Sequence, residues 1–258
     1  LGVYTQEIPL LTDCAMEPVV KGFKTGDGVP CSCYPKFQSF MGELADAKHL
    51  KVLVDRFLPA VDSGQLIHRL RSGIRVCDLG CGQGLAPILM ARAFPQSRFT
   101  GMDLAQEALA HARRSATKQG LKNIDFRVAD AALLDLEPSL TGAFDYVTAF
   151  DAIHDQQNPA GALRGVHHIL APEGLFSMVD IAAHTNPADN LDNPMAPFLY
   201  TVSLMHCMPM GLNNGGAGLG MMWGREKAEA MLTEAGFSRV TILEMPDDPF
   251  NLHFQCRR

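Results

Sequence analysis

From about residue 73 onwards, short apolar runs alternate with longer amphipathic stretches. The short runs predict strands, and the longer stretches, in which apolar residues recur three and four positions apart, predict helices. The expected strands are 74–79, 97–102, 124–128, 146–150 and 175–181, and the expected helices are 85–94, 106–119 and 160–170. Strands that alternate with helices in this way predict a parallel sheet with helices on both of its faces.

The pattern changes at the end of the chain. A helix is expected near 225–235, and two further strands are expected near 239–244 and 251–256. Only a short segment with Pro246 and Pro249 separates these two strands, so they predict an antiparallel hairpin.

The first 36 residues contain four prolines and a glycine-rich run at 22–28, which predict turns and no long regular element. Residues 37–58 have apolar side chains at helical spacing, which predicts one or two helices with a buried stripe. We therefore expect an N-terminal segment, 1–72, and a main α/β domain, 73–258. Because the sequence starts with Leu1 rather than methionine, we expect missing upstream sequence or a tag that was removed.

The alternation stops between residues 183 and 222, a stretch rich in methionine and glycine. A long insertion in a compact domain is usually functional, so a lid or binding loop is expected here. Helices that pack over the sheet or form a dimer contact would explain the apolar content equally well.

Composition narrows the possible classes of protein. Of the 258 residues, 47% are hydrophobic, and the net charge is −6. A disordered chain is excluded by the apolar content, and a non-specific nucleic-acid binder is disfavoured by the negative charge. The sequence shows no secretory leader and no apolar run long enough to span a bilayer, so we expect no membrane association.

Seven cysteines are spread irregularly along the chain, which suggests reduced thiols and a cytoplasmic location rather than a disulfide framework. Cys31 and Cys33 could join His206 and Cys207 at a soft metal ion. However, the chain contains no C-x-x-C pair, and we expect no bound metal.

The most informative segment is Asp78-Leu-Gly80-Cys-Gly82-Gln-Gly84, which lies between a predicted strand and a predicted helix. Glycines at alternate positions allow a tight turn and the close approach of a ligand. A dinucleotide-binding G-x-G-x-x-G motif is the competing interpretation, but its third glycine would fall on Leu85 or Pro87. The spacing therefore disfavours a nicotinamide oxidoreductase.

Three carboxylates lie at the ends of successive predicted strands, at Asp78, Asp103 and Asp130. Parallel sheets bind ligands beyond the carboxyl ends of their strands, so these side chains should meet at one edge. Carboxylates repel a pyrophosphate but suit a ligand with a positive charge, hydroxyls and amines. S-adenosylmethionine, which has a sulfonium, an ammonium group and no phosphate, fits these requirements.

The chain resembles the class I S-adenosylmethionine-dependent methyltransferases over roughly residues 37–258. The resemblance rests on five segments: VCDLGCGQG at 76–84, GMDL at 101–104, VADA at 128–131, FDYVTAFDAIHD at 144–155 and LAPEGLFSMVDI at 170–181. It implies a Rossmann-like, seven-stranded, mostly parallel sheet with an antiparallel terminal strand. Longer members of the most similar group carry an N-terminal winged-helix domain that they use for dimerisation, which leaves a homodimer open.

The resemblance also implies where S-adenosylmethionine, and its product S-adenosylhomocysteine, would bind. The glycine loop would lie against the methionyl part, Asp103 would bind the ribose, and Asp130 with Ala131 would bind the adenine. Tyr34 and Phe37 would lie in a segment that covers the cofactor and the substrate. The full set of expected cofactor-binding residues is Asp78, Gly80, Cys81, Gly82, Gly84, Asp103, Leu104, Asp130, Ala131 and Phe150.

His154 is the candidate catalytic base, because in similar O-methyltransferases a His-Asp step follows the fourth strand. An imidazole can take the proton of a phenol or thiol near neutral pH. A histidine at this place that only packs or hydrogen-bonds is the alternative. Gln156 also departs from the tryptophan usual in the plant enzymes.

The expected activity is methyl transfer to an O, S or N atom of a small molecule. The Asn/Asp-Pro-Pro-Tyr/Phe run of amino-methyltransferases is missing after Phe150, and no nucleic-acid-binding surface is visible. A cofactor-binding regulator with a missing DNA-binding head is the alternative function. Methylation of arsenic through Cys31 or Cys33 is a further possibility.

Overall fold

The computed structural model describes residues 6–258, and at its centre lies a seven-stranded sheet with the order β3-β2-β1-β4-β5-β7-β6. β7 runs antiparallel to both of its neighbours, whereas the other neighbouring strands are parallel. The strands are β1 (Arg75–Leu79), β2 (Arg98–Asp103), β3 (Ile124–Val128), β4 (Phe144–Phe150), β5 (Leu170–Ile181), β6 (Arg239–Met245) and β7 (Asp248–Arg257).

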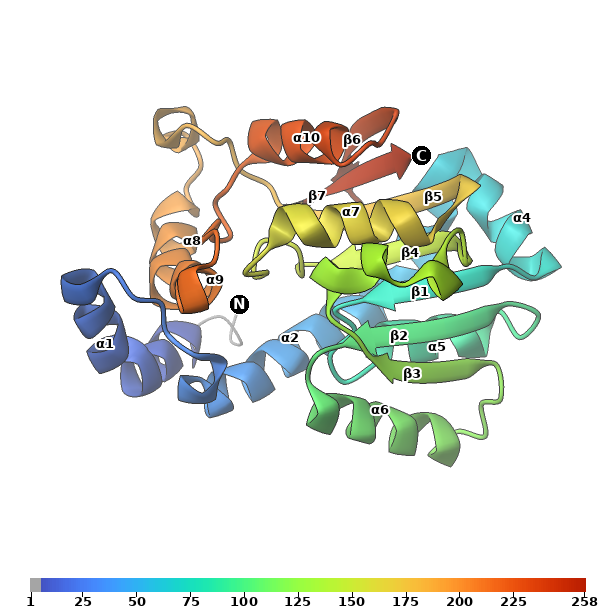
Figure 1. Cartoon of the computed structure of the whole chain (residues 1–258), viewed down its shortest axis with the longest axis horizontal. Coiled ribbons are helices and arrows are strands. Elements are labelled where there is room, and N and C mark those ends of the chain that lie inside the picture. Colours follow the sequence, from blue (N-terminus) through green and yellow to red (C-terminus); the bar gives the residue numbers. More distant parts are fainter. Residues whose placement is uncertain (1–5) are drawn as a thin grey trace.

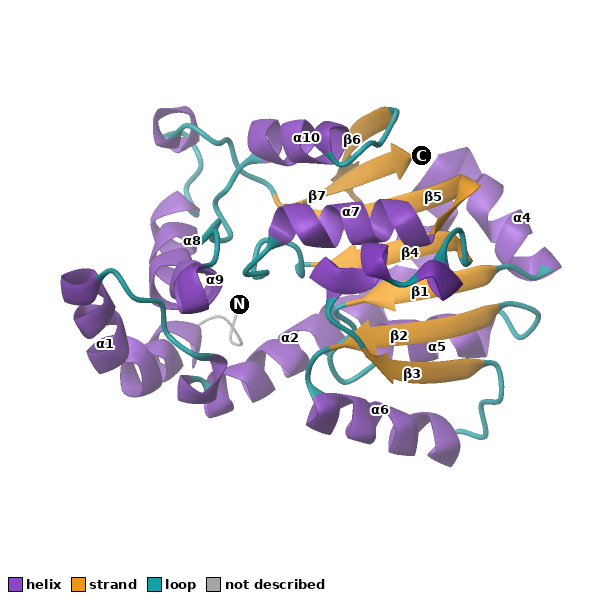
Figure 2. Cartoon of the chain, in the orientation of Figure 1, coloured by secondary structure: helices purple, strands orange, loops and turns teal. Residues whose placement is uncertain are grey.

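Helices flank the sheet and form a separate group beside it (Figure 2). They are α1 (Glu7–Thr25), α2 (Pro35–Val52), α3 (Leu58–Ala60), α4 (Gln65–Ser72), α5 (Leu85–Ala93), α6 (Gln106–Lys118), α7 (Pro159–Ile169), α8 (Ala196–Val202), α9 (Met208–Leu212) and α10 (Arg225–Glu234). Two π-helical segments, Leu53–Phe57 and Ser203–Cys207, join α2 to α3 and α8 to α9. Within residues 6–258, no helix combines the length and the apolar content needed to cross a bilayer.

Both faces of the sheet are buried under helices, as the alternating pattern predicts. One core joins α7 and α10 to inward side chains such as Val147 and Phe176. The other joins α4 and α5 to Val76, Phe99 and Tyr146 on the opposite face. Apolar burial on both sides explains why the central strands are continuous hydrophobic runs rather than alternating ones.

The predicted order of strands and helices from residue 73 onwards is confirmed, including the terminal hairpin, with boundaries that differ by a few residues. The largest difference is at β5, which begins at Leu170 instead of residue 175. Leu170 pairs with Phe144 before the register shifts between Phe144 and Tyr146, so an irregular pairing lengthens the strand.

The prediction that residues 1–36 form no long regular element is wrong, because α1 spans 19 of them. Pro9 lies in the first turn, where a backbone N–H has no helical partner to lose, and only Pro18 lies well inside the helix. A buried stripe of Leu11, Ala15 and Val19 offsets the cost of that proline.

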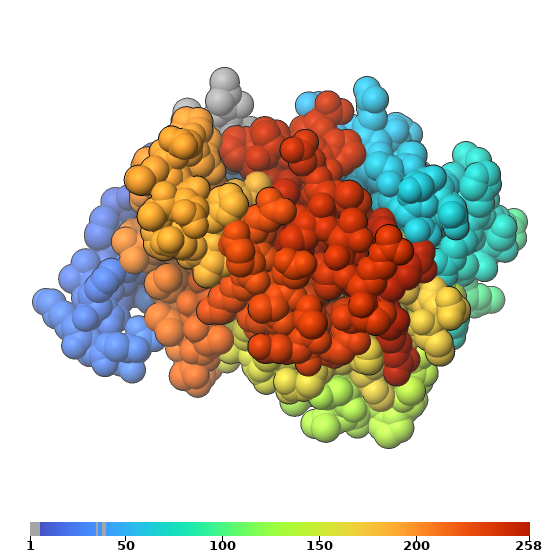
Figure 3. All heavy atoms as spheres, turned by 90° about the horizontal axis from the view of Figure 1, so that it is seen from above, coloured from blue at the N-terminus to red at the C-terminus, as the bar shows by residue number. Residues whose placement is uncertain are grey.

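The insertion at 183–222 contains α8, a π-helical segment and α9, which pack against α1 rather than over the sheet (Figures 1 and 3). The buried stripe of α1 meets Val202 and Met205 of the insertion, together with Tyr34, Phe37 and Phe40. The segment is thus helical, but its helices pack on the N-terminal helix instead of over the sheet as one interpretation expected; its role as a lid or binding loop stays a prediction.

In Figure 1 the arrowheads of β1, β2 and β4 point towards the side on which α1, α8 and α9 lie. The carboxyl edge of the parallel strands, where ligands of such sheets bind, thus faces the helical group formed by the N-terminal helix and the helices of the insertion.

Replacement of Leu11 by alanine tests the packing of α1. Leu11 is fully buried, whereas Met16 on the same helix is 45% exposed. We expect Leu11→Ala to lower the free energy of unfolding by about 2–5 kcal/mol, because it leaves a cavity. Met16→Ala should change it by less than about 0.5 kcal/mol. Urea denaturation measures both values, and equal effects would contradict the observed helix.

Candidate active site

The glycine loop leaves β1 in a tight turn whose backbone conformation favours glycine. Gly80, Gly82 and Gly84 have φ values of +70°, +52° and +80°. A Cβ atom on Gly80 would lie 2.6 Å from the Ala152 Cβ, so the loop lies directly against the segment that follows β4. The Gly80 N–H donates to the Met102 carbonyl at 2.8 Å, which ties the loop to β2.

Asp103, at the end of β2, holds this loop in place. Its Oδ2 atom accepts the Gly82 N–H at 2.8 Å, and its Oδ1 atom accepts the Ala105 N–H at 2.8 Å. Each carboxylate oxygen has a second lone pair, so both can accept a further hydrogen bond. The neighbouring Leu104 side chain is exposed.

Asp130 occupies the corresponding position after β3, and its Oδ1 atom accepts the Ala132 N–H at 2.9 Å. Ala131, the next residue, is buried. Phe150 ends β4, and its ring meets those of His49 and Phe57 at centroid distances of 4.8 and 5.7 Å. The predicted cofactor residues thus lie at the ends of neighbouring strands.

Asp78 lies deeper than the other two carboxylates. Its side chain is buried, and its Oδ1 atom accepts the Thr148 hydroxyl of β4 at 2.6 Å. Burial raises the pKa of Asp78 to about 7, although the Thr148 hydrogen bond opposes this shift. Burial also raises the pKa of the nearby Cys81 thiol, so this cysteine is inert as a nucleophile.

α2 approaches the carboxyl edge of the sheet. A Cβ atom on its Gly42 would lie 3.4 Å from Nε2 of Gln83, which belongs to the glycine loop. Further along α2, Lys48 Nζ contacts Asn251 Oδ1 at 3.0 Å, and His49 packs on Phe150.

His154 is anchored by a buried carboxylate. Its Nδ1–H donates to Asp180 Oδ1 at 2.8 Å, and the two side chains are only 4% and 1% exposed. The Trp223 indole N–H donates to the same oxygen at 3.0 Å. Burial alone would lower the pKa of His154, but the charges of Asp180 and Asp155 outweigh burial and hold it well above its ordinary value.

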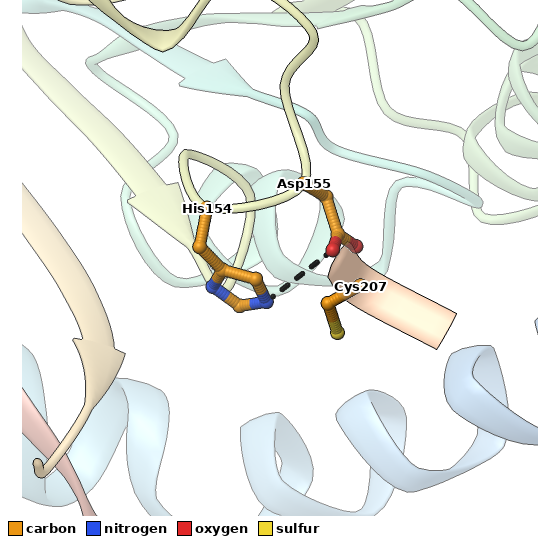
Figure 4. A group of neighbouring side chains, drawn as sticks. All are labelled: His154, Asp155 and Cys207. Carbon is orange, nitrogen blue, oxygen red and sulfur yellow. Dashed lines mark ion pairs between the residues drawn. The ribbon is translucent and has the colours of Figure 1, made fainter. Parts of the chain in front are cut away.

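The other ring nitrogen of His154 faces two further side chains (Figure 4). His154 Nε2 lies 3.5 Å from Asp155 Oδ1. Cys207, at the end of the insertion's π-helical segment, completes a group in which one donor atom from each of the three residues lies within 4.8 Å of the other two. Neither Cys31 nor Cys33 belongs to this group, so the thiol arrangement considered from the sequence is not the one in the described part of the chain.

Tyr34 and Phe37 are fully buried and reach this region through His206. Their rings lie 4.9 and 4.6 Å from the His206 ring, and the Tyr34 hydroxyl donates to the Met205 carbonyl at 2.8 Å. His206 Nδ1 in turn lies 3.4 Å from Cys207 Sγ.

Sequence reasoning did not identify Asp180, Trp223 or Cys207 as residues of this site. Asp180 interrupts an apolar run, and a carboxylate inside a buried strand was the available signal. Cys207 lies in the insertion and Trp223 directly follows it. No sequence pattern indicates which part of the chain the insertion packs against.

A family model described as a methyltransferase domain matches residues 70–246. A ubiquinone biosynthesis O-methyltransferase from Xanthomonas axonopodis pv. citri is 35% identical over 103 residues, which cover 40% of this chain. This match spans only 41% of the length of that relative.

Solved structures share the fold at low sequence identity. A provisionally named O-methyltransferase from Nostoc punctiforme aligns with 100% of this chain and 72% of its own, with a TM-score of 0.69 and 18% identity. PigF, solved with S-adenosylhomocysteine, aligns with 98% of this chain and 70% of its own, with a TM-score of 0.67 and 19% identity.

The sheet order, the reversed terminal strand, the glycine loop and the family match agree with one another. The chain therefore belongs to the methyltransferase domain family and has the Rossmann-like class I methyltransferase fold.

Proposed function

We propose that this protein transfers the methyl group of S-adenosylmethionine to an O, S or N atom of a small molecule. The observation that carries this proposal is the glycine loop in positive φ, surrounded by Asp78, Asp103 and Asp130 at the ends of three adjacent strands. Such an edge suits a cationic nucleoside without a phosphate. Membership of the methyltransferase domain family supports the same activity.

The carboxyl edge of the sheet offers a place for each part of the cofactor. The ribose hydroxyls would donate to Asp103, whose oxygens keep free lone pairs, and the adenine would lie near Asp130 and Ala131. Leu104 and Phe150 would give apolar contacts on either side. The methionyl part would follow Gly80, Cys81, Gly82 and Gly84, with its ammonium group towards Asp78.

Residues 1–72 would cover the bound cofactor. The approach of α2 to Gln83 and the packing of His49 on Phe150 support this role. Tyr34 and Phe37 would help to form the acceptor site indirectly. Their rings pack on the imidazole of His206, which would line that site.

His154 would act as the general base that removes a proton from the acceptor. In the transfer, a lone pair of the acceptor forms a bond to the methyl carbon while the carbon–sulfur bond breaks, and the electron pair stays on sulfur as S-adenosylhomocysteine forms. An acceptor hydroxyl or thiol must also lose its proton. Asp180 accepts the Nδ1–H, so in the neutral imidazole Nε2 of His154 presents the lone pair that takes this proton. Because the charges of Asp180 and Asp155 raise the pKa of His154, the population of this neutral form increases with pH.

The acceptor would be a small molecule rather than a nucleic acid. The ubiquinone biosynthesis relative is an O-methyltransferase, which favours an oxygen nucleophile here as well. We expect the protein to work in the cytoplasm, and a homodimer fits the expected winged-helix relatives. Sustained turnover would distinguish this enzyme from a cofactor-binding regulator.

Asp103→Ala tests the cofactor site. The substitution removes charge-assisted hydrogen bonds to the ribose and the anchor of Gly82, so the Kd for S-adenosylhomocysteine should rise about 10- to 100-fold. Asp125→Ala is the matched control, because Asp125 binds Thr100 on the protein surface. Isothermal calorimetry measures both, and wild-type affinity in Asp103→Ala would refute this binding mode.

The pKa of Asp78, about 7, predicts a pH-dependent affinity. Asp78 is protonated well below pH 7, and a bound ammonium group favours its charged form. Affinity for S-adenosylhomocysteine should therefore rise up to about tenfold from pH 5.5 to 7.0, while the ligand's own amine stays charged. Calorimetry at both pH values should show the rise in the wild type and lose it in Asp78→Asn; an equal rise in that variant would contradict the assignment.

His154→Gln tests the catalytic role. With a phenol or thiol that the wild type methylates in a panel of such acceptors, kcat should fall by about 10²- to 10⁴-fold, because proton removal is lost. The Kd for S-adenosylhomocysteine should stay within about twofold. His168→Gln, which affects a surface contact with Thr141, should leave kcat unchanged. Unchanged turnover in His154→Gln would reject the role.

A further inference from the structure

The side chains beyond Nε2 of His154 offer a donor set that a general base does not need. One ring nitrogen of His154, one carboxylate oxygen of Asp155 and the Sγ atom of Cys207 lie within 4.8 Å of one another and converge from two separate segments (Figure 4). A nitrogen, an oxygen and a sulfur donor together suit a borderline-soft divalent ion such as Zn²⁺, whereas Mg²⁺ and Ca²⁺ prefer oxygen ligands alone.

The second nitrogen of His154 is held as in known zinc sites. Zinc-binding histidines usually donate their other ring N–H to a carboxylate, which fixes the direction of the ligand nitrogen. Asp180 Oδ1 accepts this N–H at 2.8 Å and is itself held by the Trp223 indole at 3.0 Å. The ring is therefore oriented before any ligand arrives.

Asp155 lies beside the other two donors of this group. Its Oδ1 atom is buried and has no hydrogen-bond partner among the side chains that the structure describes, although the side chain as a whole is 26% exposed. This oxygen lies 3.5 Å from His154 Nε2, so it forms an ion pair with the ring only when the ring is protonated. A divalent cation between the two residues would neutralise the carboxylate when the ring is not protonated.

Cys207 supplies the third donor from a distant part of the chain. It is 5% exposed and ends the π-helical segment Ser203–Cys207, a type of distortion that recurs at functional sites. His206 Nδ1, 3.4 Å from Cys207 Sγ, can donate a hydrogen bond to the thiolate that a metal requires.

We propose that His154, Asp155 and Cys207 form a binding site for a zinc-like divalent cation, with Asp180 and His206 as supporting residues. Three protein ligands leave a fourth tetrahedral position for a water molecule or for the thiol or hydroxyl of an acceptor. The proposal revises the expectation from the sequence that no metal binds. It does not depend on methyl transfer, because it rests on the donor set alone.

The ion and a proton exclude each other at Nε2, which has one lone pair. In the metal-free protein the imidazole takes the acceptor's proton, as proposed above. With a divalent ion bound, the cation would lower the pKa of a coordinated thiol or hydroxyl, whose proton would pass to solvent.

Cobalt and zinc binding to the full chain, without cofactor or acceptor, tests the site. Protein stripped by a chelator should bind one equivalent of Co²⁺ and show the ultraviolet absorption of a sulfur–cobalt bond. One equivalent of Zn²⁺ should displace it and raise the Tm of the wild type.

Cys207→Ser should lose the sulfur–cobalt band, and both Cys207→Ser and Asp155→Asn should weaken zinc binding at least about tenfold. Cys31→Ser, which changes an exposed thiol outside the group, should behave like the wild type. Circular dichroism checks that each variant is folded. The zinc-induced rise of the wild-type Tm tests the site even if a variant fails to fold.

Failure of the wild type to bind one equivalent, or persistence of the sulfur–cobalt band in folded Cys207→Ser, would overturn the metal site. Calorimetry with S-adenosylhomocysteine on the same samples separates the two proposals. Metal binding without cofactor binding would refute only the proposed function, and cofactor binding without metal binding would refute only the metal site.

Discussion

The hydrogen bond between Asp103 and the backbone of the glycine loop is the constraint on which the site depends. At φ values of +52° to +80°, the loop exposes backbone N–H groups that helices and strands would otherwise satisfy. Asp103 accepts one of them from Gly82, which joins the loop after β1 to the end of β2, and its other oxygen accepts the N–H of Ala105 just beyond β2. The same carboxylate thus shapes the loop and keeps lone pairs for a ligand.

A second constraint links the insertion to the centre of the sheet. Asp180 Oδ1 accepts hydrogen bonds from His154 and Trp223, so the end of β5, the segment after β4 and the end of the insertion share one atom. The Thr185 hydroxyl donates a hydrogen bond to the Trp223 carbonyl at 2.9 Å, which joins the beginning of the insertion to its end. Cys207 and His206 are thereby brought to His154, although they follow it by some fifty residues.

The sequence was sufficient to predict the sheet, because its strands are buried on both faces and its helices carry one apolar stripe each. The positions of Asp103 and Asp130 at neighbouring strand ends follow from parallel topology alone. The prediction failed where packing outweighs local preference: α1 contains Pro18 and is stabilised by contacts with residues near Val202. Cys207 was missed as a neighbour of His154 for the same reason, since only tertiary packing joins them.

A crystal structure of the protein with S-adenosylhomocysteine tests the central claim most directly. The account predicts the ribose hydroxyls within hydrogen-bond distance of Asp103, the adenine beside Ala131, and the sulfur between the glycine loop and His154. Electron density for the nucleoside at any other part of the molecule, with the carboxyl edge of the sheet unoccupied, would contradict it.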